Sequence, residues 1–455
     1  MTNDLDRESL GEDTDSRPPD GDAPSTLRAG GDACDPAAMS DASIPVATPS
    51  YAARLAFVVE LAERLHTYGT TAQRLEGAVN AVAASLELDC EPWSNPTGLI
   101  LTFSDPKRPP GESDTTRVIR LPPGDTELAK LCEVDRIAEE VMAGRLDLAE
   151  GHAALRALDR APSRRWRAMQ VLGFGLAAGA VAGLLRLPWL DIGVAAVTGL
   201  LIGALELSGR RHPQIKEAGD ALAALVAGFL AILVATFVAP LNLDTVIIAS
   251  LIVLLPGMSL TNAVNELTSQ HLVSGTARFA GAITTVMKLT VGTVIALGLA
   301  QLVGLVPHVR AWRPQPDGIE WLSLALAAYA FAVLFGTARR DYPLVMLSAI
   351  AGYLISRLGG AAWGGPAGIF LSALVMTAAG NGYARWVKRP GALVRVPGIV
   401  MLVPGSASLR GVMNLIQQQD VAVGQDAALA VMNILLALIA GLLFGNLLLP
   451  TRRNL

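Results

Sequence analysis

The stretch that decides the fold is Leu251 to Leu267, LIVLLPGMSLTNAVNEL, in which Pro256-Gly257 interrupts an apolar run. Proline cannot donate the helical hydrogen bond and its ring clashes with the preceding turn, while glycine adds backbone freedom at the same point. Inside a bilayer the freed backbone groups must be satisfied by protein or by cavity water. Polar side chains follow the break: Ser259, Thr261, Asn262, Asn265 and Glu266. The stretch therefore predicts a broken membrane helix that holds a polar solute at membrane depth.

A second copy of this pattern begins at Ile399, where the sequence to Leu415 is IVMLVPGSASLRGVMNL. Its polar residues follow Pro404-Gly405 in the same way: Ser406, Ser408, Arg410 and Asn414. Two unrelated proline kinks are the simpler alternative, because proline is frequent in membrane helices. The repetition of the surrounding spans favours a duplicated unit instead.

The composition is that of a membrane protein. Of the 455 residues, 52% are hydrophobic and only 17% are charged, and several apolar runs exceed the ~18 residues that indicate a membrane helix. Ten spans are predicted, near 168–185, 188–208, 219–239, 243–262, 277–305, 319–336, 342–358, 366–386, 396–415 and 427–449. The second span carries Asp191 and Glu206 near its ends, where snorkelling to the interface explains them.

Four segments are expected along the chain. Residues 1–50 are rich in Asp, Pro, Gly and Ser, which predicts a disordered leader. Residues 51–160 form a small α+β cytoplasmic domain, and residues 161–308 and 309–455 form two five-helix membrane halves.

Within the α+β segment, helical apolar spacing and turn signals place four helices and two strands. Thr70 or Thr71 is expected to cap the second helix. The predicted helices run from Tyr51 to Tyr68, from there to about Leu86, and near Asp125–Ala143 and Asp147–Leu158, with strands at Leu99–Phe103 and Arg117–Leu121.

Lysine and arginine in the loops predict the orientation. With the α+β domain in the cytoplasm, 17 basic residues fall on the cytoplasmic side and four fall outside: Arg186, Arg310, Arg313 and Arg357. This asymmetry predicts ten spans with both termini in the cytoplasm. Because five is an odd number, the second half must be inverted relative to the first. Inverted halves with matching broken helices are a recurring plan of alternating-access transporters.

Few polar groups lie inside the spans, and they are the candidate site residues. Lys288 lies near the middle of the fifth span, where it could hold a substrate carboxylate, pair with Glu266 or Glu206, or take part in proton coupling. Arg410 could bind a carboxylate or snorkel. The hydroxyl and amide side chains behind the breaks could bind a small zwitterion, or form hydrogen bonds between helices. The whole candidate transport path is Pro256, Gly257, Ser259, Thr261, Asn262, Glu266, Lys288, Pro404, Gly405, Ser406, Arg410 and Asn414.

Two enzymatic alternatives are less favoured. Gly405-Ser406-Ala407-Ser408 matches a pattern of intramembrane serine proteases, but the serine needs a nearby base, and the candidate histidines fall in loops. In the α+β segment, His66, Arg74, Glu76 and Glu133 could suggest a hydrolytic site, but no nucleophile motif accompanies them. We therefore predict no catalytic residues, no metal and no cofactor.

The chain resembles the threonine/serine exporter family. The matching motifs are Leu255-Pro256-Gly257 with Leu260-Thr261, Gly275-Thr276-Ala277-Arg278, Val403-Pro404-Gly405 with Arg410-Gly411, and, before the spans, Tyr68-Gly69 to Glu76, Pro96-Thr97-Gly98 and Leu131 to Arg136. The resemblance covers about residues 51–450, with the two halves fused in one chain. It implies an exporter of L-threonine and L-serine that depends on the proton motive force.

The predicted function is thus secondary export across the cytoplasmic (inner) membrane. The sequence has no GxxxxGK[ST] motif of an ATP-driven pump, which leaves an ion gradient, most simply protons, as the energy source. The expected partners are L-threonine, L-serine or a similar small molecule, protons and the lipid bilayer, with no nucleic acid; the chain could form a homo-oligomer. A transporter or channel for another small polar metabolite is the main alternative.

Overall fold

A computed structural model gives the fold of this chain. The residues that it describes are 49–109, 111, 114–209, 212–310, 315–402, 409, 411, 413 and 421–450. The predicted leader therefore lies almost wholly outside the described residues. So do most of the second Pro-Gly stretch and all five of its candidate residues: Pro404, Gly405, Ser406, Arg410 and Asn414.

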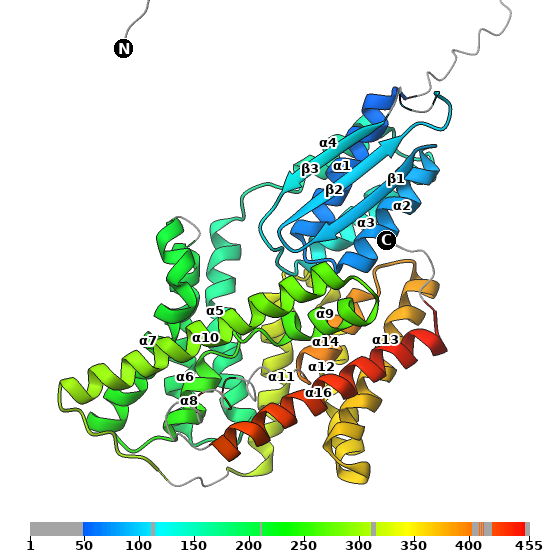
Figure 1. Cartoon of the computed structure of the whole chain (residues 1–455). Helices are drawn as coiled ribbons and strands as arrows, with labels where there is room; N and C mark the ends of the chain where they lie inside the picture. Colours follow the sequence, from blue (N-terminus) through cyan, green and yellow to red (C-terminus); the bar gives the residue numbers. More distant parts are fainter. Residues whose placement is uncertain are drawn as a thin grey trace, which may run out of the picture. The chain divides into compact units, whose positions relative to one another are not determined.

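Residues 51–157 form a three-stranded sheet with four helices (Figure 1). The elements are α1 (Tyr51–Thr67), α2 (Ala72–Ser85), β1 (Asp89–Asn95), β2 (Gly98–Ser104), β3 (Thr115–Arg120), α3 (Leu128–Met142) and α4 (Leu148–Ala157). The four predicted helices and two predicted strands are confirmed. The strand β1 was missed, because Pro92 and several polar residues weaken its strand pattern; proline is tolerated there since β1 lies at the edge of the sheet.

The sheet is antiparallel with the order β1-β2-β3, so that β2 lies in the middle. Leu99, Leu101 and Phe103 point from β2 to the buried side, where they pack with α1 side chains such as Phe57 and Leu61. Alternate residues of a strand face opposite sides, so this spacing gives β2 one fully buried face.

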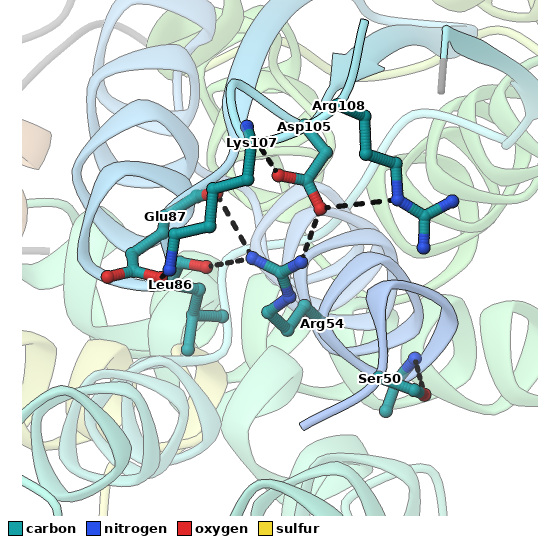
Figure 2. Close-up of polar contacts among 8 residues, drawn as sticks. Ser50, Arg54, Leu86, Glu87, Asp105, Lys107 and Arg108 are labelled. Carbon is teal, nitrogen blue, oxygen red and sulfur yellow. Dashed lines mark hydrogen bonds and ion pairs between the residues drawn. The ribbon is translucent and has the colours of Figure 1, made fainter. Parts of the chain in front are cut away.

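Polar contacts around Arg54 tie the ends of several elements together (Figure 2). Its guanidinium donates to the Leu86 carbonyl oxygen (2.9 Å) and to Asp105 Oδ2 (2.6 Å). The backbone N–H of Lys107 donates to Asp105 Oδ1 at 3.0 Å, and this bond, with Arg54, lowers the pKa of Asp105. The cluster joins α1 to the end of α2 and to the turn after β2.

The rest of the chain is helical. Its helices are α5 (Arg164–Leu184), α6 (Trp189–Gly209), α7 (Pro213–Phe237), α8 (Leu243–Ser250), α9 (Gly257–Thr268), α10 (Leu272–Leu302), α11 (Asp317–Leu334), α12 (Tyr342–Trp363) after a short 3-10 turn, α13 (Gly365–Val387), α14 (Ala392–Val400) and α16 (Val421–Leu448). Among the described residues, seven helices are long and apolar enough to cross a membrane, and α11 is a shorter apolar helix. The chain is a multi-pass membrane protein.

The predicted spans coincide with these helices, except where the Pro-Gly pairs lie. The fourth predicted span is two helices, α8 and α9, separated by Leu251–Pro256. The ninth begins as α14, and its continuation lies mostly outside the described residues. Ten spans and an inverted repeat stay predictions.

Small residues allow membrane helices to approach closely. A Cβ atom added to Gly175 or Gly199 would lie within 3 Å of the facing α5 or α6 atoms. Gly441 of α16 likewise faces Ala373 of α13. These glycines are packing positions between neighbouring helices.

Asp191 contradicts its expected role. Its side chain is fully buried rather than snorkelling, and Oδ2 accepts a hydrogen bond from the Asn242 backbone N–H at 3.1 Å. Asn242 precedes α8, so this carboxylate satisfies a donor at the helix start.

Candidate functional site

The interrupted helix places polar groups in the membrane part of the chain. The helix α8 ends at Ser250, and α9 starts at Gly257 with Pro256 as its N-terminal flanking residue. Between them, only short turns are closed, such as Gly257 N–H to the Leu255 carbonyl oxygen at 2.8 Å. The first backbone N–H groups of α9 therefore lack the carbonyl partners that a continuous helix would provide.

A cavity of about 670 Å³ lies at this interruption, and we call it the break cavity. Its lining includes residues 252–259 and Asn262. Four residues of the predicted transport path therefore line it: Pro256, Gly257, Ser259 and Asn262. Val400 and Met401, which end α14 just before the second Pro-Gly pair, line the same cavity. Its volume lies within the ~300–1,000 Å³ that is typical of small-molecule sites.

Charges of both signs line the break cavity. Glu206 of α6 and Asp220 of α7 provide carboxylates, and Arg278 of α10 provides a guanidinium. Asp125 and Glu127 add carboxylates from the segment before α3. Such a mixed lining suits a small zwitterion, because an ammonium and a carboxylate each meet an opposite charge.

Lys288 has a different partner from those predicted. Its Nζ lies 3.6 Å from Asp220 Oδ2 and donates to the Glu217 carbonyl oxygen at 3.1 Å. Glu266 pairs with Arg278 rather than with Lys288. Lys288 does not itself line the break cavity, but it reaches the cavity through Asp220.

Glu266 is the centre of a buried network. Its side chain is fully buried, and its carboxylate accepts hydrogen bonds from Arg278 Nε and Nη2 (both 3.2 Å) and from Ser274 Oγ (2.8 Å). Oε1 also accepts from the Ala72 backbone N–H at 3.1 Å. Thr71 flanks the start of α2, as predicted, but its side chain makes no capping bond. Glu266 therefore caps the N-terminus of α2, although it lies 194 residues after Ala72 in the sequence.

A second polar contact joins the same two regions. His271 Nε2 lies 3.0 Å from Glu76 Oε2, and Glu76 Oε1 accepts from the Ser94 backbone N–H at 2.8 Å. The turn between α9 and α10 is thereby attached to α2 and β1. Residues 51–157 are thus tied directly to the helix that follows the break.

The four residues considered for a hydrolytic site do not share a cluster. His66 Nε2 contacts the Pro122 carbonyl oxygen at 3.1 Å, and burial lowers its pKa. Glu76 contacts His271, and Glu133 pairs with Arg136. Arg74 lines a second cavity, together with Thr261 and Asn262.

The sequence prediction missed some residues of this site. Asp220 lies at the start of a span, where a carboxylate does not stand out as functional. Arg278 was noted only within a family motif, and its place in the cavity depends on tertiary packing.

Thr261, a residue of the predicted path, is buried, and its hydroxyl donates to the Gly257 carbonyl oxygen at 3.2 Å, which stabilises the first turn of α9.

These features define a class: a multi-pass membrane protein with a charged cavity at a broken helix. The family model ThrE, described as "Putative threonine/serine exporter", matches residues 56–300, and the model ThrE_2, described as "Threonine/Serine exporter, ThrE", matches residues 320–448. The chain belongs to the threonine/serine exporter family.

Relatives of known name are distant. The "Threonine/serine exporter" of Corynebacterium glutamicum is 23% identical over 71% of this chain and 67% of its own length. The "Probable threonine/serine exporter" of Mycobacterium tuberculosis is 24% identical over 71% and 63%. The "Pheromone-regulated membrane protein 10" of Yarrowia lipolytica is 24% identical over 79% of this chain but only 30% of its own length. No solved structure matches the chain.

Proposed function

We propose that this protein is a secondary exporter of small hydroxy amino acids, L-threonine and L-serine, driven by the proton motive force. The observation that carries the proposal is the break cavity, in which carboxylates and a guanidinium surround the start of α9. The names of the two bacterial relatives support the substrate class.

The lining suggests how a zwitterion would be oriented. Asp220 and Glu206 would receive the ammonium group, and Arg278 with the N-terminal end of α9 would receive the carboxylate. Ser259 and Asn262 would bond the substrate hydroxyl. Threonine differs from serine by one apolar methyl group, so the same polar groups would bind both amino acids.

Proton coupling would use a carboxylate of the same cavity. Asp220 is the best candidate, because its Oδ2 lies 3.6 Å from Lys288 Nζ and protonation of the carboxylate would weaken this pair. Proton and amino acid would then compete for Asp220, which links their movements in opposite directions.

The proposed orientation places residues 51–157 and both termini in the cytoplasm, following the excess of basic residues in the loops assigned to that side. The two five-helix halves would be inverted relative to each other, and the break cavity would open alternately to the two sides.

The test is uptake into inside-out vesicles that contain the purified full chain. Threonine and serine should accumulate only when a proton gradient is imposed, and Asp220→Asn should abolish the dependence on the gradient. Thr293→Val is the matched control, because this buried hydroxyl bonds the Leu289 carbonyl oxygen within its own helix and does not line the break cavity. Other small polar metabolites are tested in the same vesicles. If one of them accumulates and threonine does not, the substrate assignment is wrong.

A further inference from the structure

A second cavity of about 290 Å³ adjoins the break cavity, and we call it the arginine cavity. It lies between α2, α9, α13 and α14, and it shares Gly69, Thr126, Met258 and Asn262 with the break cavity. Its lining thus comes from residues 51–157 and from both membrane halves. No role is assigned to it by the family match.

Two arginines line this cavity: Arg74 from α2 and Arg395 from α14. Neither lies within 4 Å of a carboxylate oxygen among the described residues. Both residues line the same cavity of about 290 Å³, so their like charges share one small space. Two like charges in an enclosed space destabilise each other unless an anion lies between them.

Two other arginines that lie against membrane helices make the contrast clear. Arg389 forms a bidentate pair with Asp341, with distances of 2.6 and 2.7 Å. Arg278 pairs with the buried Glu266. Shielded charges are usually paired in this way, and Arg74 and Arg395 differ from these two arginines in that respect.

Asp135 is the carboxyl that acts on Arg74. Burial raises the pKa of Asp135 to about 7, and its Oδ1 has no hydrogen-bond partner among the described residues. Because burial raises its pKa, this carboxyl is a weaker counter-charge for Arg74 than an exposed aspartate would be. A positive charge is left for a ligand.

Neutral hydrogen-bonding groups complete the lining. Asn262, Asn265, Asn381 and Asn446 are present, and Asn381 Nδ2 donates to Asn446 Oδ1 at 2.9 Å. The Thr70 hydroxyl oxygen is shielded from solvent and has no partner among the described residues. These groups could bond the oxygens of an anion that the guanidinium groups attract.

We infer that the arginine cavity binds the carboxylate group of a small organic molecule between Arg74 and Arg395. Guanidinium groups match a carboxylate with two parallel N–H···O bonds. The small volume selects a ligand about the size of an amino acid. The bound carboxylate would join α2 to α14, which precedes the second Pro-Gly pair. The source is either the carboxylate of the transported amino acid or that of a free organic acid.

The test measures binding to the purified full chain, and it does not depend on transport. Thermal stability is titrated with propionate, L-threonine and L-threoninol, which lacks the carboxylate, at constant ionic strength. Propionate and threonine should raise the melting temperature in a saturable way, and threoninol should not compete with propionate. Arg74→Gln and Arg395→Gln should each weaken propionate binding at least 10-fold.

Arg136→Gln is the matched control, because this arginine pairs with Glu133 and Glu140 away from the cavity; propionate binding should stay unchanged. If a glutamine variant does not fold, Arg74→Lys and Arg395→Lys keep the charge but lose the planar fork, and weaker binding is again expected. Threonine competing at least 10-fold better than propionate identifies the substrate as the source, and equal competition identifies a free acid. Equal propionate binding by wild type and folded arginine variants, or no saturable binding, overturns the inference. Failed threonine uptake with retained propionate binding would reject only the proposed function.

Discussion

Glu266→Gln tests the network that attaches residues 51–157 to the broken helix. The substitution keeps the size of the side chain but replaces a carboxylate by an amide with only one acceptor oxygen. In the wild type, the two oxygens accept from Ser274, from two nitrogens of Arg278 and from the Ala72 backbone. The amide nitrogen of glutamine would face at least one of these donors, and the charge of Arg278 would lose its partner.

The expected cost is large because the pair is buried: the side chain of Glu266 is 0% and that of Arg278 is 17% exposed. Removing one member of a buried pair costs about 3–5 kcal/mol, since an uncompensated charge is left behind. At about 2 °C per kcal/mol, this destabilisation lowers the melting temperature by roughly 6–10 °C.

The assay is thermal unfolding of the purified full chain in one detergent, with limited proteolysis between residues 51–157 and α5 as a second readout. Lys288→Gln is the control, because Lys288 is 41% exposed and lies 3.6 Å from its partner, a contact worth below about 1 kcal/mol. The double variant Glu266→Gln/Arg278→Gln should lose less than the sum of the single variants. A melting temperature for Glu266→Gln equal to that of the Lys288 control would refute the reasoning.

Further predictions concern the break, one carboxyl and the topology. Pro256→Ala should favour a continuous helix and reduce threonine uptake per molecule by more than it reduces protein abundance; normal uptake would separate the break from transport. Burial raises the pKa of Asp135 in the folded protein to about 7, so between about pH 4 and pH 7 the folded state binds more protons than the unfolded state. The free energy of unfolding should therefore decrease as the pH rises from about 4 to about 7, by up to about 4 kcal/mol. Asp135→Asn should remove that slope, and an unchanged slope would contradict it. A cysteine at position 313 should be labelled from outside, and one at 216 should not.

The membrane helices could be predicted from the sequence because length and apolarity alone select a spanning helix. An interruption at Pro256-Gly257 could be predicted because proline removes a helical hydrogen bond and clashes with the preceding turn. That α8 already ends at Ser250 could not be predicted from the proline alone. The edge strand β1 could not, since its pairing with β2, rather than its own composition, makes it a strand.

The partners of the charged residues could not be predicted. Lys288 was expected to hold a substrate carboxylate, to pair with Glu266 or Glu206, or to take part in proton coupling, but Asp220 of a neighbouring helix lies beside it. Glu266 caps a helix 194 residues earlier in the chain, a contact for which no local pattern exists. Apolar patterns state which face of a helix is buried, but not which neighbouring helix supplies the opposite charge.

Residues 51–157 are attached to the membrane part at the elements that flank the two Pro-Gly pairs. Glu266 on α9 caps α2, and Leu128 of α3 packs with Leu393 of α14. If α9 moves during transport, the contact of Glu266 either breaks or moves with it. Breaking the hydrogen bond from the Ala72 N–H to the Glu266 carboxylate, worth about 1.5–3 kcal/mol, would leave roughly 1–10% of the molecules in the broken state, because each 1.4 kcal/mol is a factor of ten. We therefore expect residues 51–157 to move together with α9 in most molecules, and a ligand that joins Arg74 to Arg395 would restrain α2, and with it α9, together with α14.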